Sequence, residues 1–202
     1  KWLEAASYAL SKFPNDQLRT CVDEGISLIE RAQAEDGYLN TLYLIGNMEE
    51  RWTNVRDKHE LYCAGHLIEA AVACVKNLGD TRLFTVAEKL INHIDSVFGK
   101  EEGKMHGYPG HEEIEIALIK LYEYTMQDKY LNLARYFIDE RGKEPRFFDE
   151  EARRRGAETP PYGPTGGKYT YEYNQSHLPV RQQKTAVGHA VRALYLYCAM
   201  AQ

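Results

Sequence analysis

The sequence predicts an all-α fold in which helical hairpins stand around a common axis and form part of a toroid. Apolar residues recur at helical spacing through most of the 202 residues. A short polar turn also recurs between the two helices of a pair, at residues 79–84, at 127–131 and more weakly at 15–18. A repeat of roughly 50–65 residues is typical of hairpins that pack side by side.

Seven helices are expected, and they alternate in character. They span residues 1–11, 16–34, 58–78, 80–98, 111–126, 128–140 and 181–201. The first helix of each pair is apolar on most sides, whereas the second is apolar on one side only, as expected of an inner and an outer row. Three pairs are complete and a fourth inner helix is present. A closed ring of six pairs needs several more helices, so the sequence predicts about half of a toroid.

The connections between these helices differ in length. Residues 36–41 are expected to form a turn and an extended segment. Residues 142–179 hold five of the seven prolines and a basic run at 153–155, and we expect this segment to be irregular. Both ends of the chain fall within apolar helices. We therefore expect residues 1–202 to be a single partial domain of a longer polypeptide.

The composition excludes several classes of partner. The net charge is −5 with both signs interleaved, which argues against nucleic acid and anionic membranes. No apolar run approaches the ~20 residues of a membrane span. The cysteines form no C-x-x-C pair, so we expect reduced and mostly buried thiols, a cytoplasmic location and no structural zinc site from these residues alone. They are Cys21, Cys63, Cys74 and Cys198.

Three histidines follow a glycine where a predicted helix begins: His66, His111 and His189. Imidazoles repeated at the same place in separate hairpins point to one shared pocket. A neutral histidine both donates and accepts hydrogen bonds, and a tyrosine adds a ring face and a hydroxyl, so the pattern favours sugar binding. The residues expected to bind the sugar are His59, Tyr62, His111 and His189, with Asp36, Tyr38 and Asn40 from the first loop. For any one histidine, capping its own helix or filling the core is the alternative.

Two other chemistries find less support in the sequence. His59 and His66 lie roughly 10 Å apart along one helix, whereas zinc needs its ligands within about 2 Å, so no metal site is expected in this chain. Glutamates near the expected pocket could form an acid/base pair for glycoside hydrolysis. They are Glu60, Glu69, Glu112, Glu113 and Glu115. For Glu112 and Glu113 we favour a role as partners of the helix dipole.

Four stretches together resemble glycoside hydrolase family 127, the β-L-arabinofuranosidase family. They are DGYLNT at 36–41, HELYCAGHLIEA at 59–70, GYPGH at 107–111, and HLPVRQQ with AVGHAVR at 177–183 and 186–192. The resemblance implies an (α/α)6 barrel followed by β-sandwich domains. It implies a retaining mechanism with a zinc-bound cysteine as nucleophile and a glutamate as acid/base. It also matches His59, His111 and His189 to sugar-contacting histidines of the family.

The zinc ligands that the resemblance implies are cysteines and a glutamate, and no stretch of this chain matches their motif. Zinc and the catalytic residues are therefore expected in the full-length protein, outside this chain, which alone should be inactive. The expected function is part of a glycoside hydrolase acting on L-arabinofuranosides or related sugars, with the carbohydrate and the remaining polypeptide as partners. The alternatives are another (α/α)6 sugar enzyme, such as an unsaturated glucuronyl hydrolase or an epimerase, and a non-catalytic helical-repeat scaffold that binds glycan or peptide.

Overall fold

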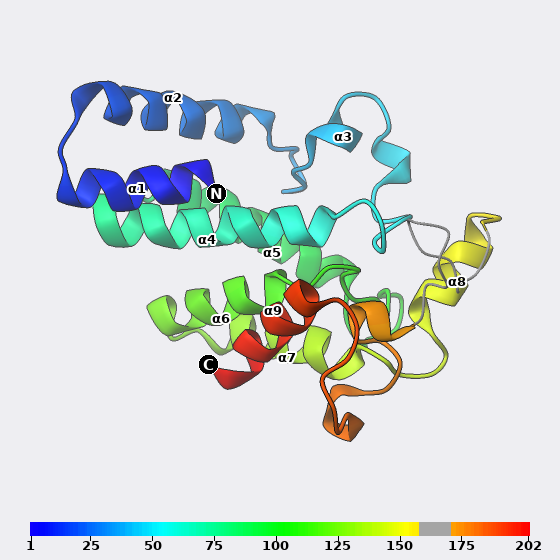
Figure 1. Ribbon diagram of the computed structural model, residues 1–202. Helices are drawn as coiled ribbons and strands as arrows, with labels where there is room; N and C mark the ends of the chain where they lie inside the picture. Colours follow the sequence, from blue (N-terminus) through cyan, green and yellow to red (C-terminus); the bar gives the residue numbers. More distant parts are fainter. Residues whose placement is uncertain (158–170) are drawn as a thin grey trace.

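A computed structural model describes residues 1–157 and 171–202 of the chain (Figure 1). These residues form nine α-helices and three short 3-10 helices. The α-helices are α1 (Trp2–Lys12), α2 (Asp16–Ala32), α3 (Thr41–Leu44), α4 (Glu60–Leu78), α5 (Arg82–Val97), α6 (Ile114–Thr125), α7 (Asp128–Glu140), α8 (Phe147–Arg154) and α9 (Ala190–Ala201). The 3-10 helices are Met48–Glu50, Tyr171–Asn174 and Val180–Gln182.

The long helices form two rows. Helices α1, α4, α6 and α9 pack against one another in that order, and α2, α5 and α7 each pack on the inner helix that precedes them in the chain (Figure 1). Helices α2 and α5 also contact each other in the outer row. The expectation of an all-α partial toroid, with an inner and an outer row, is confirmed.

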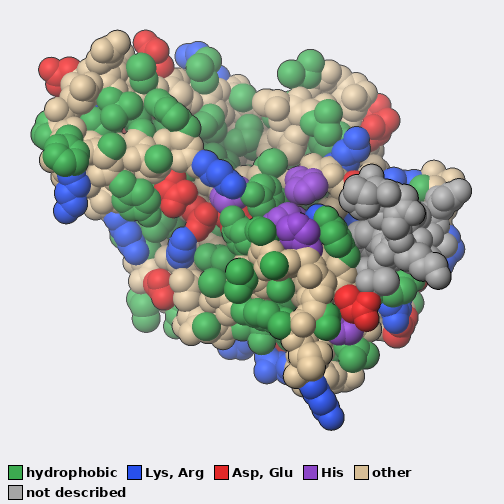
Figure 2. All heavy atoms as spheres, viewed as in Figure 1, with side chains coloured by type: hydrophobic (Ala, Val, Ile, Leu, Met, Phe, Trp, Pro, Cys, Tyr) green, Lys and Arg blue, Asp and Glu red, His purple; other side chains and the backbone are tan. Residues whose placement is uncertain are grey.

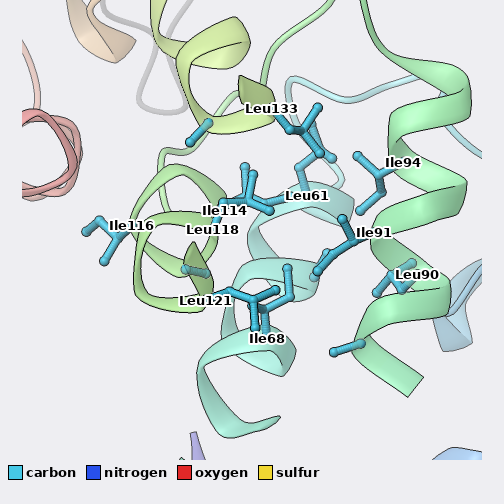
Figure 3. Packing of buried hydrophobic residues seen from close by; sticks show 14 of the residues in the cluster. Leu61, Ile68, Leu90, Ile91, Ile94, Ile114, Ile116, Leu118, Leu121 and Leu133 are labelled. Atoms are coloured by element: carbon cyan, nitrogen blue, oxygen red, sulfur yellow. The ribbon is translucent and has the colours of Figure 1, made fainter. Parts of the chain in front are cut away.

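The hydrophobic core fills the space between α4, α5 and α6 (Figure 3). Helix α4 is buried on most sides because it lies between α1, α5 and α6, which explains its nearly continuous apolar sequence. Each large aliphatic side chain buried here contributes about 1.5–3 kcal/mol. The core side chains include Leu61, Ile68, Leu90, Ile91, Ile94, Ile114, Leu118 and Leu121.

Three expectations about local structure need correction. The last helix begins at Ala190 rather than at 181, because Gly188 adopts a left-handed conformation with φ +82° that a helix cannot continue through. Part of the segment expected to be irregular forms α8, whose amphipathic face buries Phe147 and Phe148. Residues 158–170 of that segment lie outside the described residues. Residues 36–40 are non-helical as expected, but α3 begins directly after them at Thr41.

The cysteines are less buried than expected. Only Cys74 is buried, and its Sγ lies 3.1 Å from the hydroxyl of Ser7. Cys21, Cys63 and Cys198 are exposed. All four are free thiols. Among the described helices, none combines the length and apolar character that a membrane crossing requires.

Candidate functional site

Three of the predicted site residues meet on one surface. The ring of His59 lies 5.7 Å from that of Tyr62 and 6.0 Å from that of His111, and the rings of Tyr62 and His111 are 4.6 Å apart. Tyr195 of α9 joins them, 5.5 Å from His111 and 6.4 Å from Tyr62. We call these four residues the aromatic cluster. Figure 2 shows histidine side chains near the middle of this face, between the part formed by α1, α2 and α4 and the part formed by α6 and α9.

His59 lies at the start of α4, on a loop that buried carboxylates hold in place. Its backbone is left-handed with φ +58°, which is uncommon outside glycine and persists only where neighbours enforce it. The carboxylate of Glu60 accepts from the backbone N–H of Trp52 at 3.1 Å, and that of Glu151 accepts from Val55 at 2.6 Å. Burial raises the pKa of both glutamates to about 7. These contacts fix the loop that presents the His59 ring.

His111 lies three residues before α6, on a loop held by two buried arginines. Nη2 of Arg141 donates to the carbonyl of Pro109 at 2.8 Å, and Nη1 of Arg192 donates to the carbonyl of Gly110. Gly110 also packs against the backbone of Arg56 so closely that a Cβ at this position would overlap the Arg56 carbonyl oxygen. The backbone before the His111 ring is therefore fixed on several sides.

The ring nitrogens of His59 and His111 have defined roles. Nδ1 of His59 lies 2.7 Å from the carbonyl oxygen of Asp57, and Nδ1 of His111 lies 2.8 Å from that of Glu112. A carbonyl oxygen only accepts, so each Nδ1 carries the proton and the Nε2 of the neutral ring is an acceptor. Burial lowers the pKa of His111 to about 4, which keeps its ring neutral near pH 7. An acceptor of this kind fits a hydroxyl group.

His189 lies close to the aromatic cluster but makes its ring contact elsewhere. It is the residue before α9, and its backbone N–H donates to the carbonyl of Tyr173 at 3.2 Å. Its ring lies 5.3 Å from the Tyr173 ring. After burial itself, the charges of Arg192, His59 and His189 also act to lower the pKa of His111, which places all three within electrostatic reach of that ring.

The other three predicted residues take part in a different network. Asp36 pairs with Arg51 at 2.6 Å, and Asn40 accepts from the backbone N–H of Leu42 at the start of α3. The Tyr38 hydroxyl donates to Glu60 at 2.5 Å, and its side chain has no exposed surface. The structure therefore corrects the placement of Tyr38, which cannot contact a ligand. Asp36 and Asn40 bond to Arg51 and to the backbone of Leu42, and their role in sugar binding stays a prediction.

His66 does not lie where a helix begins, as its Gly-His pattern suggested, but within α4. The preceding Gly65 lets α6 approach, since a Cβ there would lie 2.6 Å from Cγ of Glu113. Nδ1 of His66 lies 2.9 Å from Glu113 and 3.3 Å from Glu69. Although burial disfavours the charged ring, these two carboxylates raise the pKa of His66 to about 10. His66 is therefore a partly buried cation of α4 that pairs with Glu113, the residue before α6.

His66, Glu69 and Glu113 also form a group whose ligand atoms all lie within 4.8 Å of one another. The group contains no cysteine, so it does not fit the cysteine and glutamate zinc site that the resemblance implies. Lys120 pairs with Glu69, so together with His66 it supplies two positive charges for two carboxylates. The described residues therefore provide an ion-pair network here.

The expectation that Glu112 and Glu113 serve only the helix dipole is wrong. Both side chains are completely buried before the start of α6, and each faces a cation. Nη1 of Arg141 lies 3.1 Å from Glu112, and its Nη2 lies 3.3 Å from Glu115. Burial raises the pKa of Glu112 to about 8 and that of Glu113 to about 7. These buried glutamates, together with their cations, support the loop that carries His111.

The model of the β-L-arabinofuranosidase GH127 catalytic domain matches residues 1–202. This chain belongs to that family. The non-reducing end β-L-arabinofuranosidase of Bifidobacterium longum is 44% identical over 200 residues, which are 97% of this chain and 30% of that protein. The solved GH127 β-L-arabinofuranosidase of Geobacillus stearothermophilus is similar with a TM-score of 0.93 and 52% identity, over 99% of this chain and 31% of that one.

A second solved GH127 β-arabinofuranosidase is similar with a TM-score of 0.80 and 33% identity, over 98% of this chain and 29% of that one. The chain thus spans about a third of the length of these relatives. The matches agree with the family that the four sequence stretches resemble, rather than with either alternative that the sequence left open.

Three residues of this site escaped the sequence analysis: Arg141, Tyr195 and Arg192. The last two had a signal, because Arg192 and Tyr195 are three residues apart and so are neighbours on the surface of α9, just after His189. Arg141 had none, since a single arginine after a helix usually lies in solvent.

Proposed function

We propose that this chain forms one wall of the substrate pocket in a glycoside hydrolase that cleaves β-L-arabinofuranosides. The observation that carries the proposal is the meeting of His59, Tyr62 and His111, which come from two separate loops and one helix. Membership of the family and the activity named for its relatives support the sugar class.

The chemistry of the cluster suits a furanose. The Nε2 atoms of His59 and His111 accept hydrogen bonds from sugar hydroxyls, and the rings of Tyr62 and Tyr195 pack against the C–H groups of the sugar. The Tyr62 hydroxyl accepts from Nζ of Lys1 at 2.9 Å and keeps its own proton to donate. Two kinds of hydrogen-bonding group and two ring faces then orient one sugar in the pocket.

The reacting groups belong to the remaining polypeptide in this proposal. The nucleophile, the acid/base residue and the zinc site that the resemblance implies lie outside this chain, and the residues here bind and orient the substrate. Such orientation contributes several kcal/mol of barrier lowering in enzymes generally. Four free cysteines support a cytoplasmic location as part of the same proposal.

The test is hydrolysis by the full-length protein of 4-nitrophenyl β-L-arabinofuranoside, with the α-anomer as a matched control. We expect nitrophenol release from the β-anomer only, and loss of that activity after chelation of zinc. Cleavage of unsaturated glucuronides or epimerisation of a free sugar would contradict the proposal in favour of another (α/α)6 enzyme. Glycan binding without hydrolysis of any substrate would favour a non-catalytic scaffold.

A further inference from the structure

Arg192 is an arginine of α9 that lies almost completely within the protein, with 9% of its surface exposed. Its guanidinium donates to the carbonyl of Gly110 and lies 4.6 Å above the ring of Tyr173. We propose that Arg192 is a positioning residue that holds the His111 and His189 segments in the geometry needed to bind the sugar. This inference rests on the proposed function, although one of its tests does not need a substrate.

The first contact fixes His111. Gly110 directly precedes it, and the Gly110 N–H donates weakly to the carbonyl of Val55 at 3.4 Å while its Cα packs on the backbone of Arg56. That N–H belongs to the Pro109–Gly110 peptide group, whose Pro109 carbonyl accepts from Arg141. The Gly110 carbonyl belongs to the next peptide group, which leads directly into His111, and it is bound by Arg192. Each of the two peptide groups before His111 is therefore held by a hydrogen bond, and Arg192 of α9 holds the nearer one.

The second contact reaches His189. The Tyr173 ring contacts both the Arg192 guanidinium and the His189 ring, which lies 5.3 Å away. The backbone N–H of His189 donates to the Tyr173 carbonyl, which joins the two segments. A planar guanidinium over an aromatic face is a favourable arrangement that an ammonium group reproduces less well. One side chain therefore contacts both segments that carry a histidine.

Arg192 also affects the charge of the ring that it positions. The groups acting on His111 are the Glu112 carbonyl on its own loop, His59 before α4, His189 before α9, and Arg192. Burial is the main cause of the low His111 pKa, and the Arg192 charge lowers it further. Loss of the Arg192 guanidinium should therefore raise the pKa of His111, so that its ring is protonated more easily. Removal of a residue that only stabilises another part of the fold would not change the His111 pKa.

The experiment compares Arg192→Met and Arg192→Lys in the full-length protein. We expect Arg192→Met to lower kcat/KM for the β-L-arabinofuranoside about tenfold and to raise the His111 pKa by about one unit, measured by NMR titration of the imidazole. Arg192→Lys keeps a donor and a charge and should restore the low pKa and part of the activity. The matched control is Arg82→Met on α5, which removes an arginine that pairs with Asp23 and Asp80, away from the aromatic cluster, and should leave both readouts unchanged.

A folded Arg192→Met protein with wild-type kcat/KM and an unchanged His111 pKa would overturn the inference. If Arg192→Met does not fold, Arg192→Gln decides, because its amide can donate but carries no charge: an unchanged His111 pKa in that variant also overturns it. A wild-type protein without arabinofuranosidase activity refutes the proposed function instead. The imidazole titration then tests the role of Arg192 without a substrate.

Discussion

Two polar loops of this chain, residues 36–40 and 109–113, are held in different ways, although the sequence marks both as candidate binding segments. In the first loop the side chains bond to their surroundings, as Tyr38 does to Glu60 and Asn40 to Leu42. In the second loop the backbone carbonyls are bound by Arg141 and Arg192, which come from elsewhere in the chain. A loop whose backbone is held by other elements leaves its side-chain ring free for a ligand, which is the role that we propose for His111 in the second loop.

The largest expected effect tests the buried support of the second loop. Arg141→Met leaves Glu112 and Glu115 buried without their cation and the Pro109 carbonyl without its donor. Removal of one partner from a buried ion pair costs about 3–5 kcal/mol. Urea unfolding should show a loss of that size, whereas Arg154→Met at the exposed pair with Glu150 should cost no more than about 1 kcal/mol. Equal losses in the two variants would show that the loop does not depend on Arg141.

The next effect concerns Glu60, which anchors the loop before His59. Burial raises the pKa of Glu60 from 4.5 to about 7, so the folded state holds this proton more tightly than the unfolded state. The resulting stabilisation is complete below about pH 4 and is lost as the pH rises through 7. Glu60→Gln removes this dependence while its amide oxygen still accepts from Tyr38 and Trp52.

The measurement for Glu60 is the free energy of unfolding at pH 5 and pH 8 for wild type and Glu60→Gln. Relative to the variant, the wild-type protein should lose up to about 3 kcal/mol between these two values. Identical pH dependence of the two proteins would contradict the buried, protonated state of Glu60.

The smallest effect tests the first loop directly. Asn40→Ala removes the side chain that caps α3 and should cost about 1 kcal/mol of stability in thermal or urea unfolding. Because Asn40 lies outside the aromatic cluster, kcat/KM for the β-L-arabinofuranoside should stay within about twofold of the wild-type value. A tenfold fall of kcat/KM in a folded Asn40→Ala protein would show instead that this loop takes part in binding the sugar.

The fold was largely predictable from the sequence because helical periodicity reports burial directly. The all-round apolar character of residues 58–78 predicted the central position of α4, and the one-sided pattern of residues 80–98 predicted an outer helix. The last helix begins later than predicted, since the backbone at Gly188 is left-handed.

The site was predictable only where chain geometry alone brings residues together. His59 and Tyr62 lie on one side of a single helical turn, so their contact follows from their spacing. The residue that accepts a hydrogen bond from the Tyr38 hydroxyl is 22 residues away along the chain, and those that accept from the Arg141 guanidinium are 26 or more away. No local sequence pattern reports such partners. A tyrosine bonded to a buried carboxylate and a tyrosine that faces a ligand look alike in a sequence.

The central claim is that His111 contacts the sugar from a loop held rigid by other elements. The most direct test is the kcat of a His111→Ala variant of the full-length protein on 4-nitrophenyl β-L-arabinofuranoside, with circular dichroism to verify folding. We expect kcat to fall about tenfold or more, since a contact that orients the sugar near the reacting centre is lost. Unchanged kinetics in the folded variant would contradict it.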